Sequence, residues 1–186
     1  MSTEDIFRRI VSALNGAGIP YMLTGSFASS FHGTPRATQD IDLVIAPMAS
    51  QLRHLVRLLP GAEYYVSEGA ALDALGRQGQ FHVIDLATGW KIDLIIRKNR
   101  PFSRTEFERR SGVELFGLQL FIASAEDVLV AKLERAKAGQ SQRQLEDAAN
   151  LLRVRSDELD RRYIEHWVAE LGLQEEWARA KAMASA

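Results

Sequence analysis

The segment that most constrains the fold of this chain is residues 21–45, YMLTGSFASSFHGTPRATQDIDLVI. It begins with an apolar run that ends at Gly25-Ser26, and it closes with a second apolar run, DIDLVI, which contains Asp40 and Asp42. Because side chains alternate between the two faces of a strand, both aspartates point to one face and Ile41 and Leu43 to the other. Burying unpaired carboxylates is costly, so this strand requires a cation or hydrogen-bond donors beside its polar face.

Asp40 and Asp42 suit a magnesium ion. Two residues along a strand span about 7 Å, so both carboxylates can lean toward one cation. Mg²⁺ prefers oxygen ligands and is commonly held by one or two carboxylates together with substrate phosphates. The alternative is structural: Asp40 ends the loop TPRATQ, and Asp42 lies on an exposed edge. A D-x-D motif by itself is short and fits either interpretation.

Gly25 and Ser26 indicate a turn that can bind phosphate. Gly25 follows the apolar strand and Ser26 can open a helix, whose first N–H groups would point at a ligand. Glycine also lets a triphosphate approach the backbone closely. The alternative is a plain strand-to-helix turn in which Ser26 only caps the helix.

Together, Gly25-Ser26, a spacer of 13 residues and DIDLVI resemble the nucleotidyltransferase superfamily, whose fold is shared by DNA polymerase beta and antibiotic nucleotidyltransferases. The segment RATQDIDLVI is most similar to the AbiEii-type branch, whose members often carry an arginine and a serine or threonine before the D-x-D. The resemblance covers residues 21–45 closely and the remainder loosely. It implies that Arg36 and Thr38 lie near the phosphates, where an arginine can fork onto a phosphate or an acceptor. A loop arginine is otherwise plain surface.

The resemblance also implies a third carboxylate on a later strand, which would complete a two-metal site. Asp93 in WKIDLII is the preferred residue, because its strand is strongly apolar, and Asp85 in VIDLA is the rival. If the hairpin turns at Thr88-Gly89, Asp85 pairs with Ile92, and the two aspartates face opposite sides of the sheet. The sequence does not fix this register.

A lysine downstream belongs to the same resemblance. Lys132 lies in SAEDVLVAKLERAKAG, at the edge of the apolar stripe of a predicted helix. AbiEii-type proteins place a lysine in such a helix and follow it with R-D-x-x-D; Arg143 and Asp147 match that signature, and Gln144 departs from it. The resemblance implies that Lys132 contacts the triphosphate, for which a mobile point charge is suited. The alternative is a solvated helix face with weak ion pairs.

Composition sets further limits. The 186 residues suffice for one globular domain with a small helical appendage, and the absence of cysteine excludes thiolate chemistry and disulfides. The four histidines show no spacing suited to a metal site. A net charge of −1 gives no global attraction to nucleic acid, so contact with RNA would need a local patch. With no long apolar run and a polar start, we expect a cytoplasmic protein without a membrane partner.

Hydrophobic periodicity and turn residues predict the order of elements. Helices are predicted over 2–17, 26–33 and 48–61, and strands over 21–24, 40–45, 81–86 and 90–96. A helical turn is predicted over 105–111 and a strand over 115–121, followed by helices from Ser124 to the end, including 156–171 and 173–184. The expected fold class is therefore α+β, a nucleotidyltransferase-like mixed β-sheet with flanking helices. The expected core is 1–122, and a C-terminal helical segment, 123–186, packs on it.

These expectations combine into a functional hypothesis: Mg²⁺-dependent transfer of a nucleotide monophosphate from an NTP to an acceptor hydroxyl. Asp40 and Asp42 would hold the triphosphate-bound ion, and Asp93 would share a second ion and help activate the acceptor. Resemblance to the AbiEii-type branch implies a toxin or phage-defence component, with tRNA, another RNA or a protein as acceptor and a cognate antitoxin as partner. The alternatives are an inactive relative that binds a nucleotide or a partner protein, and a small-molecule (antibiotic) nucleotidyltransferase.

Overall fold

The computed structural model describes residues 3–35 and 37–185, which divide into two compact units. The first unit contains the chain up to Thr24 together with Thr38–Ile122, and the second contains Gly25–Ala37 and the chain from Ala123 onward. The segment between the first two strands therefore groups with the C-terminal helices and not with the expected core of 1–122. Arg36, a predicted phosphate contact, lies outside the described residues.

Within its described residues, the first unit holds a seven-stranded sheet in the order β3-β4-β5-β2-β1-β7-β6. The pairs β2–β5 and β1–β7 are parallel and the other neighbours are antiparallel, which confirms the predicted mixed sheet and α+β class. The strands are β1 (Tyr21–Thr24), β2 (Asp40–Ile45), β3 (Tyr64–Tyr65), β4 (Gln80–Asp85), β5 (Lys91–Ile96), β6 (Ser111–Leu115) and β7 (Leu118–Ile122). Its helices are α1 (Thr3–Gly16), α3 (Ala49–Leu58), α4 (Glu68–Arg77) and α5 (Pro101–Glu108).

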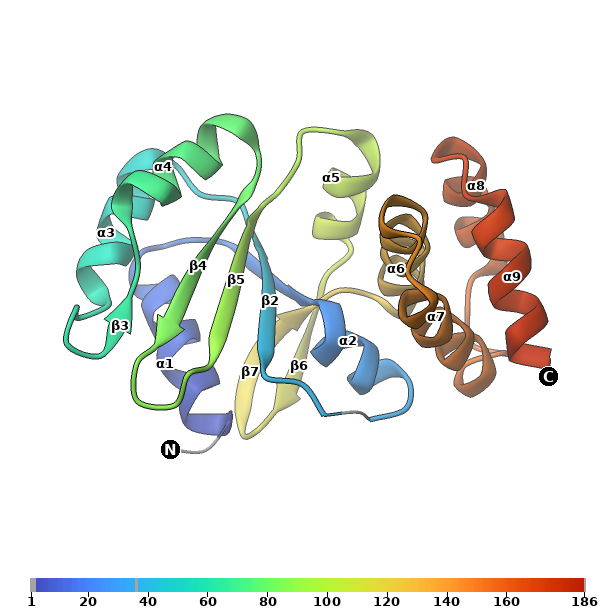
Figure 1. Cartoon of the computed structure of the whole chain (residues 1–186), viewed down its shortest axis with the longest axis horizontal. Coiled ribbons are helices and arrows are strands. Elements are labelled where there is room, and N and C mark those ends of the chain that lie inside the picture. The colour runs from blue at the N-terminus through green and yellow to red at the C-terminus, as the bar shows by residue number, and fades with distance from the viewer. Residues whose placement is uncertain (1–2, 36, 186) are drawn as a thin grey trace. The chain divides into compact units, whose positions relative to one another are not determined.

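The two faces of the central strands differ in the kind of side chain that they carry. In β2, Ile41, Leu43 and Ile45 are almost completely buried, whereas Asp40 is exposed and Asp42 half-buried. The same alternation continues into β4, where Phe81 and Val83 are buried and His82 is exposed. The apolar face is the one covered by helix α1, which Figure 1 shows behind the strands. The opposite face carries the polar side chains where β2 begins, and Val44, two residues after Asp42, is buried on it.

Two parts of the first unit differ from the predicted elements. Helix α4 and the short strand β3 were not predicted, and the region after α5 forms a hairpin of β6 and β7 in place of a single strand over 115–121. Phe116 and Gly117 make its turn, and both have positive φ angles, 53° and 67°. A turn of this kind matches the right-handed twist of the flanking strands, and glycine adopts it without strain.

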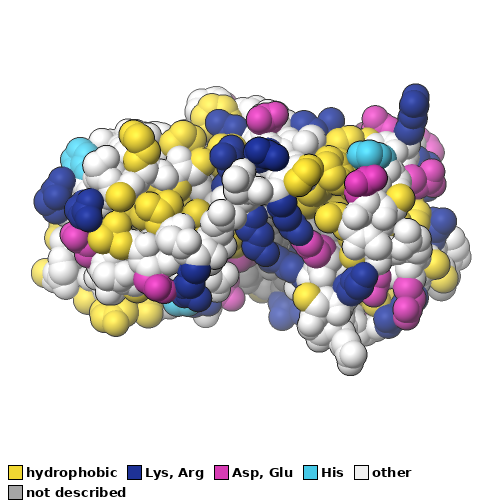
Figure 2. All heavy atoms as spheres, turned by 90° about the horizontal axis from the view of Figure 1, so that it is seen from above, with side chains coloured by type: hydrophobic (Ala, Val, Ile, Leu, Met, Phe, Trp, Pro, Cys, Tyr) yellow, Lys and Arg dark blue, Asp and Glu magenta, His cyan; other side chains and the backbone are white. Residues whose placement is uncertain are grey.

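The second unit is helical within its described residues: α2 (Gly25–His32), α6 (Ala125–Gly139), α7 (Gln142–Val154), α8 (Arg161–Glu170) and α9 (Gln174–Ser185). The Nε of Arg155 donates to the carbonyl oxygen of His32 at 2.9 Å, and one ring nitrogen of His32 contacts the carbonyl of Ala123 at 2.7 Å, so α2 is tied to the later helices. Along the described part of the chain, no helix has the length and apolar character needed to span a membrane. Acidic and basic side chains are intermixed on the face seen in Figure 2, in keeping with the net charge of −1.

Candidate active site

Three aspartates share one face of the sheet in the first unit. The parallel register of β2 and β5 places Asp42 directly beside Asp93 and Asp40 beside Lys91. Residues paired in this way point to the same face. The antiparallel neighbours add His82 of β4 opposite Asp93. Asp40, Asp42 and Asp93 therefore lie together on the polar face, as the sequence pattern predicted for the first two.

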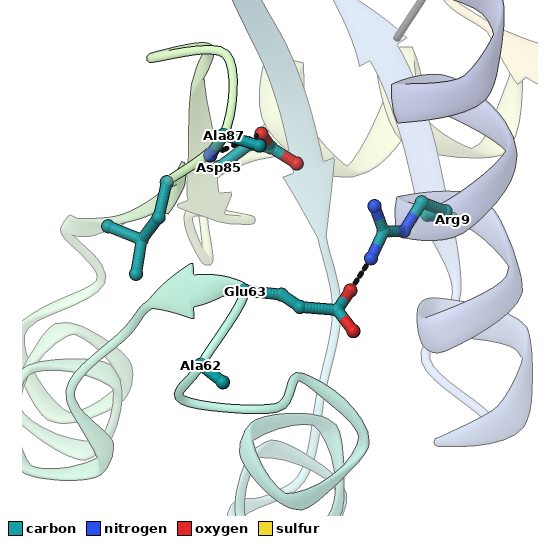
Figure 3. Close-up of a pocket in the computed structure, with 6 residues that line it drawn as sticks. Arg9, Ala62, Glu63, Asp85 and Ala87 are labelled. Carbon is teal, nitrogen blue, oxygen red and sulfur yellow. Dashed lines mark hydrogen bonds and ion pairs between the residues drawn. The ribbon is translucent and has the colours of Figure 1, made fainter.

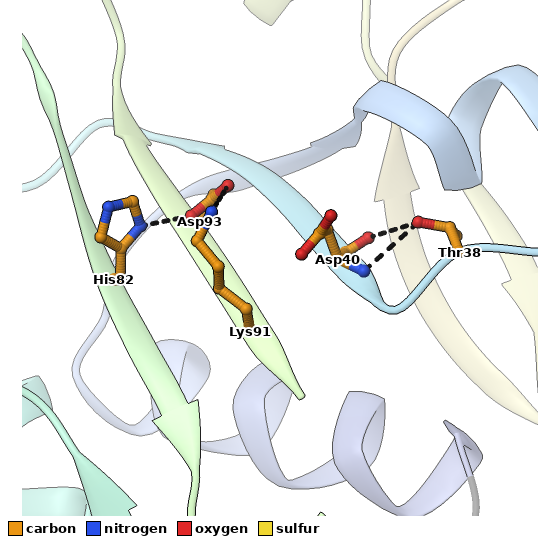
Figure 4. A network of polar contacts seen from close by, with 5 residues as sticks. All are labelled: Thr38, Asp40, His82, Lys91 and Asp93. Atoms are coloured by element: carbon orange, nitrogen blue, oxygen red, sulfur yellow. Dashed lines mark hydrogen bonds and ion pairs between the residues drawn. The ribbon is translucent and has the colours of Figure 1, made fainter. Parts of the chain in front are cut away.

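Asp93 is the most enclosed of the three aspartates and has partners on both carboxylate oxygens. Only 8% of this residue is exposed. The Nζ of Lys91 donates to Oδ2 at 2.9 Å, and Nδ1 of His82 is hydrogen-bonded to Oδ1. Figure 4 shows the two side chains reaching Asp93 from its own strand and from β4. Asp93 is thus fixed in position by a lysine and a histidine.

Lys91 experiences the charge of all three aspartates. Its hydrogen bond to Asp93 is the main cause of a raised pKa, and the negative charges of Asp93, Asp40 and Asp42 act in the same direction, against partial burial. The ammonium group is therefore held charged beside the carboxylates, because an opposite charge nearby favours the ionised form.

Thr38 stabilises the backbone where β2 begins. Its hydroxyl accepts a hydrogen bond from the backbone N–H of Asp40 at 3.3 Å and lies 3.4 Å from the carbonyl oxygen of the same residue (Figure 4). The predicted phosphate contact of Thr38 stays a prediction. Its observed interactions hold the backbone of Asp40 at the start of β2.

Asp85, the rival third carboxylate, lies on the other face of the sheet. The hairpin turns over residues 86–89, with the N–H of Asp85 bonded to the carbonyl of Trp90. This turn contains two residues more than a turn at Thr88-Gly89 would, so the pairing of β4 with β5 is displaced by two residues. Because strand side chains alternate with a period of two, Asp85 and Asp93 still face opposite sides of the sheet. Oδ1 of Asp85 accepts from the N–H of Ala87 and from both the N–H and the hydroxyl of Thr88.

The surroundings of Asp85 also separate it from the polar face. It lines a pocket of about 480 Å³ beside α1, together with an ion pair between Arg9 and Glu63 (Figure 3). Its carboxylate is buried and caps the hairpin turn. Because only Asp93 shares a face with Asp40 and Asp42, the geometry favours Asp93 as the third member of the cluster.

Gly25 and Ser26 open helix α2 directly after Thr24. Gly25 has a φ of +64°, a conformation that side chains other than glycine rarely adopt, so this position requires glycine. Thr24 is the residue of β1 that pairs with Asp42. The local backbone is thus the tight strand-to-helix turn that the sequence predicts.

Lys132 is buried inside the second unit. Only 2% of its surface is exposed, and its Nζ donates to Oδ2 of Asp147 at 2.6 Å. The interpretation of Lys132 and Asp147 as a solvated helix face is therefore wrong, whereas Arg143 is exposed. Contact between Lys132 and a phosphate stays a prediction.

The donor chemistry of the polar face fits magnesium, because three carboxylates supply the oxygen ligands that this ion prefers. As the side chains stand, no group of three histidine, aspartate or glutamate residues within 3–35 and 37–185 is gathered closely enough to hold a metal ion. Lys91 and His82 occupy the oxygens of Asp93 instead. Binding of a metal ion to Oδ2 would thus require Lys91 to move.

Sequence reasoning missed His82 and Lys91. Lys91 precedes Asp93 by two residues, so the period of a strand already places both side chains on one face. His82 carries no such signal, because its position opposite Asp93 depends on the width of the hairpin turn.

Comparison with solved structures identifies the fold. The chain is similar to an antigenic nucleotidyltransferase-like protein from Paracoccidioides brasiliensis, with a TM-score of 0.54 and 16% identity over 96% of this chain and 92% of that one. It is similar to the antibiotic-resistance factor ANT(2'')-Ia, with a TM-score of 0.55 and 13% identity over 96% and 95% of the two chains. The lincomycin-bound lincosamide antibiotic adenylyltransferase LnuA gives a TM-score of 0.54 and 13% identity over 81% and 96%.

At these identities the likeness shows the fold, and the protein therefore has a nucleotidyltransferase-like fold. No protein-family model matches the chain, and no curated protein matches it in sequence. The AbiEii-type assignment stays a prediction.

Proposed function

We propose that the protein is a Mg²⁺-dependent nucleotidyltransferase, which moves a nucleotide monophosphate from an NTP to an acceptor hydroxyl and releases pyrophosphate. The observation that carries this proposal is the register of β2 and β5, which brings Asp40, Asp42 and Asp93 to one face of the sheet. The similarity of the fold to nucleotidyltransferases supports it. Clustered carboxylates repel one another, so a protein gains from such a cluster mainly by binding a cation there.

In this proposal Asp40 and Asp42 hold the ion that carries the triphosphate, and Asp93 shares a second ion. Bound magnesium would neutralise the phosphates and stabilise the attacking and leaving oxygens of an in-line displacement. Asp93 would accept the proton of the acceptor hydroxyl, and His82, bonded to its Oδ1, would orient the carboxylate for this task.

The phosphate contacts are proposed from the resemblance of the sequence. The Gly25-Ser26 turn would offer backbone N–H groups, and the left-handed conformation of Gly25 supports a close backbone approach. Arg36, Thr38 and Lys132 are proposed as further contacts. Since Asp147 holds the ammonium of Lys132, a contact with phosphate would require this ion pair to rearrange.

Two classes of acceptor follow from different observations. ANT(2'')-Ia is described as an antibiotic-resistance factor and LnuA as a lincosamide adenylyltransferase, which favours the hydroxyl of a small molecule. The likeness of RATQDIDLVI to the AbiEii-type branch favours tRNA, another RNA or a protein, with a cognate antitoxin as partner. An inactive relative that only binds a nucleotide or a partner protein is the remaining candidate.

One labelling experiment tests the proposal and separates these candidates. The protein is incubated with each α-³²P NTP, Mg²⁺ and, in parallel, total RNA, protein extract or a panel of aminoglycosides and lincosamides. The proposal predicts metal-dependent labelling of one acceptor class by the wild type and its loss in Asp40→Ala/Asp42→Ala. Equal labelling by both proteins, or no labelling in any mixture, would contradict the enzyme proposal.

A further inference from the structure

The polar face of the sheet already contains a cation, the ammonium group of Lys91. The Nζ of Lys91 lies 2.9 Å from Oδ2 of Asp93, and in the pairing of β2 with β5 Lys91 lies directly beside Asp40. Lys91 forms an ion pair with Asp93, and the parallel register places Asp42 beside Asp93 on the same face. The charges that would attract a metal ion therefore act on Lys91 in the metal-free protein.

Lys91 is able to leave this position without disturbing the core. About 41% of its side chain is exposed, compared with 11% for Asp93. The long lysine stem is flexible and carries its charge into water at little cost. The histidine on the other oxygen, His82, is also 43% exposed at its side chain. The carboxylate is thus the enclosed member of this group, and Lys91 reaches solvent.

We propose that Lys91 is a built-in counterion, which neutralises the three aspartates in the metal-free protein and competes with the metal ion for Oδ2 of Asp93. This inference rests on the proposed metal site and adds a residue that sets how tightly that site binds. While Lys91 contacts Oδ2, this oxygen is not available as a metal ligand. The ammonium would reduce the repulsion between the aspartates when no substrate is bound. The metal ion would bind more weakly, because it has to displace the ammonium.

The test compares variants at Lys91 for Mn²⁺ binding, measured by the electron paramagnetic resonance signal of free Mn²⁺ at constant ionic strength and without nucleotide. Lys91→Met keeps the length and the apolar stem but removes the charge. Since the ammonium occupies a ligand oxygen and repels a cation at close range, we expect Mn²⁺ to bind about ten-fold more tightly once this charge is removed. Lys91→Arg keeps a positive charge beside Asp93 and is expected to bind Mn²⁺ no more tightly than the wild type.

Lys98→Met is the matched control, because Lys98 is exposed in the loop after the same strand and its loss changes the net charge equally. Its Mn²⁺ affinity should stay within about two-fold of the wild type, since exposed charges are screened by solvent and salt. An unchanged or weaker affinity in Lys91→Met, or an equal gain in Lys98→Met, would overturn the proposal.

A fourth protein separates failure of this inference from failure of the metal site. Asp40→Asn/Asp42→Asn should lose Mn²⁺ binding if the aspartates hold the ion. If this variant binds as the wild type does, or if no protein in the series binds Mn²⁺, the proposed metal site fails and the counterion with it. If Asp40→Asn/Asp42→Asn loses Mn²⁺ binding but Lys91→Met matches the wild type, only the counterion role of Lys91 is excluded.

A second readout is thermal unfolding in metal-free buffer. It should show a lower Tm for Lys91→Met than for Lys98→Met, because the aspartates then repel one another.

Discussion

Replacing Lys132 by methionine should strongly destabilise the helical unit. The substitution removes the ammonium that lies 2.6 Å from Oδ2 of Asp147, while that carboxylate remains buried at 6% exposure. Breaking a buried ion pair by removing one partner typically costs about 3–5 kcal/mol, because the remaining carboxylate loses its buried counterion. With a urea m-value of about 2 kcal/mol/M, a loss of about 4 kcal/mol lowers the midpoint by about 2 M.

The measurement is urea unfolding followed by tryptophan fluorescence. Two of the three tryptophans of the chain, Trp167 and Trp177, are buried in α8 and α9, so the signal reports mainly on the helical unit. A double variant, Lys132→Met/Asp147→Ala, removes both charges and should recover about 2 kcal/mol relative to the single variant.

The control is an exposed ion pair of the same unit, Arg155 with Glu158, whose side chains are 33% and 68% exposed. Glu158→Ala should change the free energy of unfolding by less than about 0.5 kcal/mol, because exposed pairs contribute little. If Lys132→Met is as mild as this control, the pair with Asp147 has no structural role and the reasoning is refuted.

Three further predictions address single positions. His82→Ala should lower kcat about ten-fold with little change in the KM for NTP, because the ring only orients Asp93. His82→Asn should restore part of the lost kcat. A change in KM alone would contradict this role. Burial lowers the pKa of His32 below its ordinary 6.5, so the folded state binds fewer protons than the unfolded state and stability is lost as pH falls through 6.5. The urea midpoint of His32→Gln should therefore fall less than that of the wild type between pH about 7.5 and about 5. Gly117→Ala should cost about 1 kcal/mol by thermal unfolding, since alanine is strained at a positive φ, and an unchanged Tm would argue against the turn of the β6–β7 hairpin.

Local patterns in the sequence predicted which residues share a face and where the chain turns. The period of two in DIDLVI already places Asp40 and Asp42 on one face, and the turn at Gly25 needs a residue that tolerates a positive φ. The third carboxylate required more than a pattern, because Asp85 and Asp93 sit in similar apolar strands. The pairing of β5 with β2 shows that Asp93 is the one that shares a face with Asp40 and Asp42.

Elements without an apolar stripe were the ones missed. Helix α4 buries only Ala71 and Ala74, which are too small to give a clear helical period, although Ser67 accepts a hydrogen bond from the N–H of Ala70 as an N-cap. Strand β6 has no fully buried residue, so neither of its faces marks it as a strand.

The burial of Lys132 was equally invisible from sequence. Its partner Asp147 lies 15 residues away on the next helix, and a charged residue at the edge of an apolar stripe usually points to water. Whether it is buried depends on how α6 and α7 pack, which local periodicity does not determine.

The most direct test of the proposed site compares Asp93→Asn with Asp85→Asn in the α-³²P NTP labelling assay. Both variants lose one carboxylate charge on neighbouring strands, but only Asp93 shares the face of Asp40 and Asp42. We expect Asp93→Asn to lose labelling of the acceptor and Asp85→Asn to retain it, once the amounts of folded protein are matched by fluorescence. Labelling that survives in Asp93→Asn, or that is lost only in Asp85→Asn, would contradict a carboxylate site on the polar face of the sheet.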